Sequence, residues 1–506
     1  MSIYGQLLLG GLLLLGGVST VGAEGDQTRR HDDGVKEIQH SPSVFRGDPQ
    51  YGAQAYDARQ QWLIYGGKKA VDTPRPLLEL GRDFLTAGPY ESGWPSHFIV
   101  YGDLRAPVGS GQIPGGTGVD DQSILVAALQ LNLEVDWKLT SATRIHGLVQ
   151  PFQSNLEGKP TFSRFSSGST NLDDGLEFVH IFQRCADEGC DALEAVDEFG
   201  TLFLEGDLGT SLGLGVDLPF ALGKIPMIFQ NGVWVEDAFL GGALTFPAKN
   251  SKTWDISNFD ITFFGGFDGV DSRAAVQDHK LAIMGSNLFM DAGQGYWELG
   301  YGFSLDRDAG DIDLSYHSAT LAFSRRYFDR VSNSIRLIGN FGQADEVTAN
   351  GLAILVESSL VSYSPSTLIP YFNLFLGLDR PQALAKATGL LRNTGLAYEV
   401  DVLNLVPFMN DDAHDAVGGA LGVEYLFNLD QQIVLEAAAS FGLCDASADD
   451  SCARVGARDE AALTFRHQVP LAKAWLLRTD GILGALDPLD GADVFAGLRI
   501  ELRRKF

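Results

Sequence analysis

The stretch that decides the fold is Val494-Phe-Ala-Gly-Leu-Arg-Ile-Glu-Leu-Arg-Arg-Lys-Phe506, at the end of a 506-residue chain. Its side chains alternate with the period of two that is typical of a β-strand. Two faces result: Val494, Ala496, Leu498, Ile500, Leu502 and Phe506 on one, and Asp493, Arg499, Glu501, Arg503 and Lys505 on the other. Soluble chains usually end in frayed polar tails. An ordinary edge strand is one interpretation, and the closing strand of a membrane β-barrel, which shows its apolar face to lipid, is the one we favour.

A terminal aromatic residue after alternating apolar residues resembles the assembly signal of Gram-negative outer-membrane proteins. The resemblance rests on Phe506 and the strand before it. It implies location in the outer membrane, contact with its lipid and lipopolysaccharide, and recognition of Phe506 by the barrel assembly machinery. Arg504 falls on the apolar side. So close to the end of the strand, it would lie at the level of the lipid headgroups, where a charge costs little.

Residues 1–23 read as a cleaved secretory signal peptide. The apolar run Leu7 to Val18 is followed by the small residues Val21-Gly-Ala23 before Glu24. An uncleaved anchor helix is the alternative, but glycines interrupt the run and it is short for a membrane span. Residues 24–95 are polar and poorly periodic. They could form a periplasmic extension, a plug inside the lumen, or the first strands.

The rest of the chain predicts an all-β protein. Hydrophobic residues make up 45% of the sequence, yet no apolar stretch after the signal is long enough for a transmembrane helix. Both facts agree if the apolar residues are spread over alternating strands that face lipid. We therefore expect residues 96–506 to form a transmembrane antiparallel up-and-down β-barrel of roughly 16 to 18 strands, the size of a water-filled porin.

The clearest hairpin spans residues 125–152. Odd-numbered residues from Leu125 to Leu139 are apolar, and the even-numbered side includes Glu134, Asp136 and Lys138. Similar hairpins are predicted at 315–341, 352–378, 421–443 and 461–486, each with a short turn. The connections between hairpins are longer and more acidic, which is the outer-membrane pattern of short periplasmic turns and long extracellular loops. The stretch Asp379 to Gly418 is either one long loop or a hidden pair of strands.

The net charge of −28 argues against DNA or another polyanion as a partner. Four cysteines form two close pairs, Cys185 with Cys190 and Cys444 with Cys452. In an oxidising compartment each pair is expected to close a disulfide, because neither has the spacing of zinc ligands. No haem-attachment motif occurs, and we expect no metal and no cofactor.

The segment Gly223-Lys-Ile-Pro-Met-Ile-Phe-Gln-Asn-Gly232 resembles Gly-Lys/Arg-x-Pro-x-x-Phe stretches of Gram-negative porins and porin-like exporters. In those proteins the strand and its adjoining loop pass near the constriction of the pore. The resemblance makes the following polar residues constriction candidates: Lys224, Gln230, Asn231, Glu236 and Asp237. The alternative is the start of a strand with Pro226 at a bulge or edge.

Strand alternation also predicts the charged side chains that face the lumen, where water or an opposite charge can solvate them. These pore-lining candidates are Glu134, Asp136, Lys138, Arg144, His146, Glu424, Glu436, Arg466, Arg478, Asp480, Arg499, Glu501, Arg503 and Lys505. Arginines opposite carboxylates would create a transverse field that orients solutes and tunes ion selectivity. The alternative is a lattice of ion pairs that only stabilises the wall.

No compact catalytic motif is present, and His317 in Ser315-Tyr-His-Ser318 is the nearest candidate for a catalytic base. We expect a channel for passive diffusion of small hydrophilic solutes or ions, not an enzyme. A plugged barrel serving as scaffold, receptor or partner sheath is the alternative, and an outer-membrane hydrolase is a weaker one. The resemblance to porins implies a homotrimer, a state for which the sequence carries no signal.

Overall fold

The structure is a computed structural model of the full chain. It describes residues 97–113, 122–127, 130–139, 143–154, 178–179, 200–214, 218–248, 256–272, 279–308, 313–328, 330–344, 348–360, 367–392, 394–399, 409–427, 431–443, 459–472, 475–487 and 493–505. The proposed signal peptide, the extension at 24–95, all four cysteines and Phe506 lie outside these ranges. Those predictions therefore stay predictions.

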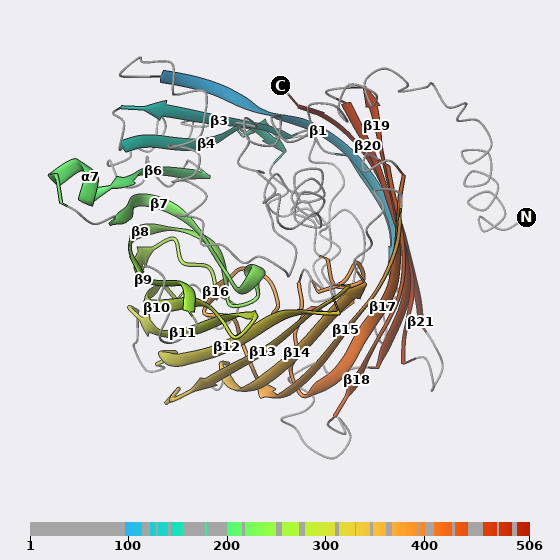
Figure 1. Ribbon diagram of the computed structural model, residues 1–506. Coiled ribbons are helices and arrows are strands. Elements are labelled where there is room, and N and C mark those ends of the chain that lie inside the picture. The colour runs from blue at the N-terminus through green and yellow to red at the C-terminus, as the bar shows by residue number, and fades with distance from the viewer. Residues whose placement is uncertain are drawn as a thin grey trace, which may run out of the picture.

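Eighteen antiparallel strands close into one barrel, as expected (Figure 1). The ring runs through β1 (His97–Ile113), β3 (Gln130–Lys138), β4 (Thr143–Ser154), β6 (Thr201–Asp207), β7 (Pro219–Phe229), β8 (Val235–Ala248), β9 (Ile256–Asp268), β10 (Leu281–Ala292), β11 (Gly295–Asp306), β12 (Tyr316–Tyr327), β13 (Val331–Phe341), β14 (Asn350–Leu360), β15 (Thr367–Arg380), β17 (Ala416–Phe427), β18 (Gln431–Gly442), β19 (Glu460–Ala472), β20 (Trp475–Leu486) and β21 (Asp493–Lys505). β21 pairs with β1 from Asp103↔Lys505 to Gln112↔Ala496, which closes the ring. No sheet edge is left open there, as a membrane barrel requires.

Three short strands complete the sheet: β2 (Gln122–Ala127), β5 (Phe178–Val179) and β16 (Ala385–Lys386). β2 pairs with the second half of β1 and β3 with its first half, so β2 and β3 together cover the length of β1. The run from Leu125 to Leu139 was expected as one strand and is divided into these two elements. Beside them are the helix α7 (Leu208–Leu212) and the 3₁₀ turn η2 (Gln230–Gly232). No helix in the described part of the chain is long and apolar enough to cross a membrane.

The two faces of β21 separate as its alternation predicts. Val494 and Ile500 are 45% and 38% exposed, whereas Arg499 on the other face is only 2% exposed. Arg504 is exposed on the outer side, and its guanidinium lies 5.4 Å from the centre of the Trp475 ring. A cation over an indole face beside lipid is what a position at the headgroup level would favour.

The outer surface is a belt of exposed apolar side chains, and Leu463 on β19 is 60% exposed within it. If this surface faces lipid, Leu463→Arg should destabilise the barrel by about 2–4 kcal/mol near the bilayer midplane. The free energy of unfolding from lipid vesicles would measure this. Leu463→Phe serves as the apolar control and should change it little. Equal losses for the two variants would contradict a lipid-facing position.

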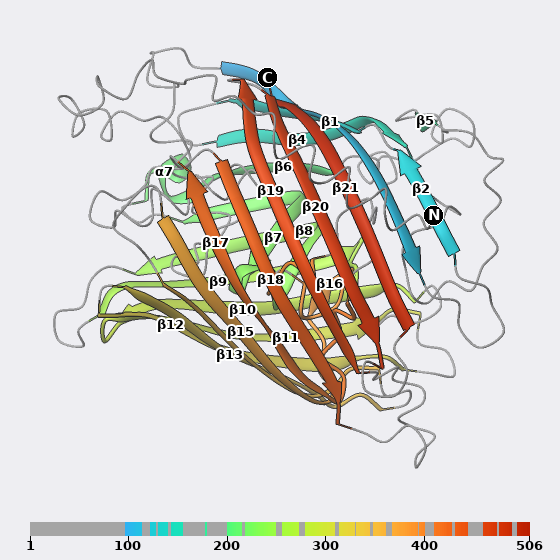
Figure 2. The ribbon, with the colours of Figure 1, turned by 90° about the vertical axis from the view of Figure 1, so that its right-hand side faces the viewer.

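Turn lengths differ at the two ends of the barrel from β10 onward. β10–β11, β12–β13, β17–β18 and β19–β20 are joined by two or three residues, at what we call the short-turn end. At the opposite, long-loop end, the connections are 307–315, 342–349, 381–415, 443–459 and 487–492. The last of these has six residues, as does the β14–β15 turn at the short-turn end. Figure 2 shows β17 to β21 side by side, running at a slant between these ends. Within the stretch Asp379 to Gly418, β15 continues to Arg380 and β17 begins at Ala416. The described residues between them form one long loop, in which only the two residues of β16 are in a strand.

Candidate functional site

The β7–β8 connection forms the first part of the candidate site, and its strands extend beyond their neighbour β6. The β6–β7 pairing ends at Leu202↔Lys224, whereas β7 and β8 pair as far as Phe229↔Val235. Pro226 lies in this overhang opposite Ala238, where β7 has no β6 partner for a backbone N–H. Gly223, with φ +127°, stands at the transition, and a Cβ there would collide with Leu202 and Phe203. Of the two expectations for Pro226, an edge position is correct, although it lies within β7 and not at its start.

The overhanging hairpin packs on the inner surface of β9 to β12. Trp234 is fully buried, and its ring centre lies 6.0 Å from those of Phe229 and Phe264. Its indole Nε1–H donates to Ser318 Oγ on β12 at 3.0 Å. The neighbouring Gly300 on β11 has no side chain, and a Cβ there would collide with the indole. The hairpin end is therefore held inside the barrel by aromatic packing.

The second part of the site is what we call the lumen-crossing segment, residues 381–399 and 409–415. One end of it is anchored on the β7–β8 hairpin. Leu384 N–H donates to Trp234 O at 2.9 Å, and β16 pairs in parallel with Val235 and Glu236. The Lys386 ammonium is buried and donates to Gly232 O at 2.8 Å, with the Glu236 carboxylate 3.7 Å away. Figure 1 shows β16 inside the ring of strands.

The other end of the segment reaches the far wall, on β18 to β20. The Glu436 carboxylate on β18 accepts from the N–H groups of Leu396 at 2.9 Å and Ala397 at 2.8 Å. Glu460 on β19 accepts from Asn410 N–H at 2.9 Å. Contacts with both walls mean that the segment crosses the interior of the barrel. Several apolar side chains of the segment join the same buried cluster as Trp234, namely Leu384, Leu390, Leu391, Tyr398 and Met409.

Tyr398 shows how completely this end is enclosed. Its hydroxyl donates to Ala439 O at 3.2 Å, and its ring meets Phe375 edge-on. Burial, with a smaller effect of the Glu436 charge, raises the pKa of the Tyr398 hydroxyl above its usual value. The hydroxyl therefore stays protonated and remains a hydrogen-bond donor at neutral pH.

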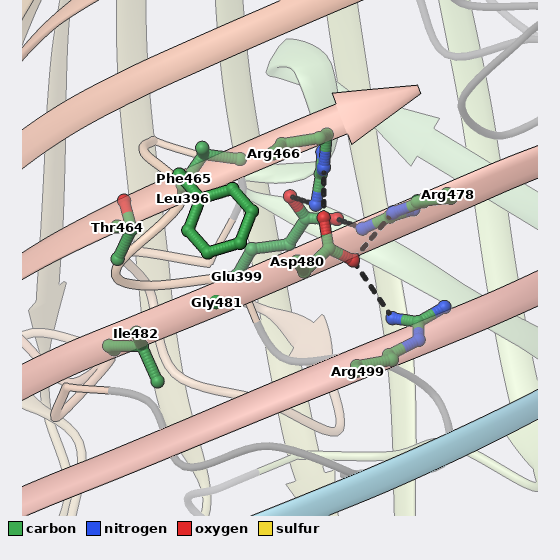
Figure 3. A pocket seen from close by; sticks show the side chains of 10 residues that line it. All are labelled: Leu396, Glu399, Thr464, Phe465, Arg466, Arg478, Asp480, Gly481, Ile482 and Arg499. Atoms are coloured by element: carbon green, nitrogen blue, oxygen red, sulfur yellow. Dashed lines mark hydrogen bonds and ion pairs between the residues drawn. The ribbon is translucent and has the colours of Figure 1, made fainter. Parts of the chain in front are cut away.

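Glu399 contacts a cluster of arginines on β19 to β21 (Figure 3). One carboxylate oxygen accepts from Arg466 Nη2 at 2.7 Å and the other from Arg478 Nη2 at 3.2 Å. The same two arginines donate their Nε–H groups to Asp480, each at 2.7 Å. Arg499 approaches Asp480 at 3.6 Å, and the group lines a small cavity with Leu396 and Thr464.

The predicted pore-lining residues continue from this cluster as a lattice of ion pairs. Arg499 pairs with Glu501, which also pairs with Arg503 at 2.9 Å, and Arg503 reaches Asp103 on β1 at 3.2 Å. A second group lies on β3, β4 and β6. There Asp136 contacts Arg144 and His146, both at 3.1 Å, and Arg144 also pairs with Glu205. We call these residues, with Arg466, Arg478 and Asp480, the charged wall.

Of the remaining pore-lining candidates, three are described and two have side chains outside the described part of the chain. Glu424 accepts from Gln432, and Glu436 holds the segment as described above. Glu134 is half-buried on β3. The side chains of Lys138 and Lys505 are outside the described part of the chain.

The constriction candidates lie along the β7–β8 hairpin, and four of them are at or next to its end. Gln230 is buried, donating its N–H to Glu298 at 3.0 Å and accepting from Thr320 Oγ1 at 2.9 Å. Asn231, with φ 59°, follows it in η2. Glu236 faces Lys386, and Asp237 accepts from Asp271 N–H at 2.8 Å. Lys224 stands on β7 opposite Leu240, and its positive charge is close enough to act on the Asp237 carboxylate.

His317 lies away from this site. Its Nδ1 is 2.8 Å from the hydroxyl of Tyr301, and its ring packs against Phe303 and Phe341. Tyr301 and Phe341 are exposed on the outer surface. The contacts described for His317 are thus those of a polar ring within an aromatic group.

The sequence-based predictions missed Lys386 and Glu399. Lys386 ties the lumen-crossing segment to the β7–β8 hairpin, and Glu399 ties it to the arginines of β19 and β20. A signal was available, because Ala383-Leu-Ala385 and Leu390-Leu391 are unusually apolar for a solvated loop. This apolar composition indicates that the loop packs against another part of the protein. It could not indicate which surface.

The chain was compared with family models, curated proteins and solved structures. No family model and no curated protein matches the chain. Among solved structures, Wzi, an outer-membrane protein involved in group 1 capsule assembly in Escherichia coli and a carbohydrate-binding β-barrel, matches at 11% identity with a TM-score of 0.46, covering 94% of this chain and 98% of its own. Pseudomonas aeruginosa OccK11 matches at 9% identity (TM-score 0.49; 81% and 96% covered) and OccK1 at 10% (TM-score 0.49; 81% and 98% covered). The assignment of the chain as a closed antiparallel β-barrel follows from its own strand pairing.

Proposed function

We propose that this protein is an outer-membrane channel through which small hydrophilic solutes or ions diffuse passively. The observation that carries the proposal is the contrast between the two sides of the wall. Exposed apolar side chains cover the outside, and charged and polar side chains such as Arg499 and Asp136 point inward. Eighteen strands are enough to surround an aqueous path.

The proposed constriction lies at the long-loop end, where the lumen-crossing segment meets the β7–β8 hairpin and the charged wall. Solutes would pass beside the segment, along side chains whose charges set ion preference. In this proposal the signal peptide directs the chain for export, Phe506 directs assembly, and the short-turn end faces the periplasm. A homotrimer belongs to the same proposal.

A plugged barrel that acts as a scaffold or receptor is the second candidate. It is favoured by the apolar packing of the segment in the lumen and by the pairing of most described charges in the charged wall. Ion pairs satisfied within the protein leave a weaker field for a passing solute than unpaired ones would.

Single-channel recording of the purified chain in a planar bilayer, with a salt gradient, tests the proposal. We expect steady open steps, and the sign of the reversal potential reports whether acidic or basic side chains dominate the path. A barrel that is silent, although folded as judged by its heat-modifiable migration in gels, would overturn the open-channel proposal in favour of the plugged scaffold.

A further inference from the structure

Glu399 joins two structures that are otherwise far apart in the chain. Its carboxylate accepts one hydrogen bond from Arg466 on β19 and one from Arg478 on the adjacent strand β20. The three side chains are largely buried. A charge-assisted pair of this kind, with both carboxylate oxygens occupied, is stronger and more directional than a neutral hydrogen bond.

The wall does not depend on this contact. Each of the two arginines donates its Nε–H to Asp480, so neither guanidinium loses its only acidic partner when Glu399 leaves (Figure 3). The other end of the segment has separate anchors at Leu384 and Lys386. Release of Glu399 therefore frees the segment from the two arginines, while the barrel, the anchors at Leu384 and Lys386 and the bonds that Glu436 accepts from the segment stay in place.

We infer that Glu399 is an electrostatic latch: its bond to Arg466 and Arg478 holds the lumen-crossing segment across the channel, and breaking that bond widens the path. The inference rests on the proposed channel function and adds a residue that sets how often the path is wide. The hydrogen bonds that Glu436 and Glu460 accept from the segment's backbone act beside the latch.

Two substitutions separate a latch from a simple effect of lumen charge. Glu399→Gln and Arg478→Gln both weaken the tie, but the first removes a negative charge and the second a positive one. A latch predicts that both raise the ratio of wide to narrow open time in single-channel records, with Glu399→Gln raising it by about tenfold. Their reversal potentials should shift in opposite directions, Glu399→Gln toward anions and Arg478→Gln toward cations.

The matched control is Asp493→Asn, which removes one negative charge from an exposed position at the start of β21. It should leave the open-time ratio unchanged. Suppose that the wild type conducts. If Glu399→Gln and Arg478→Gln then move the open-time ratio in opposite directions, or leave it at the wild-type value, the latch is wrong and the channel proposal survives. If wild type and both variants are silent although folded, the channel proposal itself fails. Should Glu399→Gln fail to fold, Arg478→Gln alone decides through the direction of the ratio.

Discussion

Excision of residues 390–410, with Gly389 joined to Asp411 through two glycines, is expected to raise single-channel conductance several-fold. The junction is short, because Gly389 N–H donates to the Asp411 side chain at 2.8 Å and the two residues are neighbours in space. The excision removes Leu396, Ala397 and Glu399, which tie the segment to β18, β19 and β20. With that barrier gone the narrowest part of the path is set by the wall, and conductance rises with its width.

The control for this excision is a shortening of the β11–β12 loop at residues 309–312, which lies at the same end of the barrel. It should leave conductance as in the wild type. Heat-modifiable migration establishes that each variant is folded before recording. A folded excision variant with wild-type conductance would show that the segment is not the barrier. A silent wild type whose excision variant conducts would identify the segment as a plug.

Trp234→Ala is expected to lower the free energy of unfolding by about 3–5 kcal/mol, the range for deleting a large buried aromatic side chain. The indole is fully buried against Phe229 and Phe264, so its removal leaves a cavity that the barrel wall cannot collapse to fill. It also leaves the Ser318 hydroxyl without its indole donor. Denaturant unfolding of the barrel from lipid vesicles measures the loss.

Trp137→Ala is the matched control, because Trp137 is exposed on the outer side of β3. Loss of an exposed indole creates no internal cavity, and we expect less than half the effect. Equal losses at the two positions would contradict the inward packing of the β7–β8 hairpin. A further readout is conductance, which should become noisier in Trp234→Ala because Leu384 bonds to the backbone of residue 234 and loses a rigid support.

The arrangement explains how one molecule supports both candidate functions. The wall has the polar inner face of a channel, and the long-loop end contains the apolar packing of a closed domain. In our proposal, which of the two behaviours dominates depends on contacts between the wall and the loop, such as that of Glu399. These ties are separate from the strand pairing that closes the barrel.

The strands of the barrel were predictable from sequence because their signal is local. Alternation in Val494 to Lys505 or in Leu131 to Trp137 needs only neighbouring residues to be read, and lipid outside with polar groups inside enforces it. The same rule placed Arg499, Glu501 and Arg503 on the inner face, where they are buried. Turn lengths, which distinguish the two ends of the barrel, can also be read from short stretches of sequence.

The ion-pair partners and the path of residues 381–415 were not predictable in this way. Lys386 bonds to a carbonyl 154 residues away, and Glu399 bonds to Arg466 across 67 residues. No local period encodes such contacts, because they depend on how strands distant in sequence are curved into a ring and on which loop turns inward. The sequence by itself determined a closed antiparallel β-barrel with charged residues on its inner face. Only the tertiary structure decided that one loop crosses the lumen, because that choice is made by packing of Trp234, Leu384 and Leu391 inside a wall that must first close.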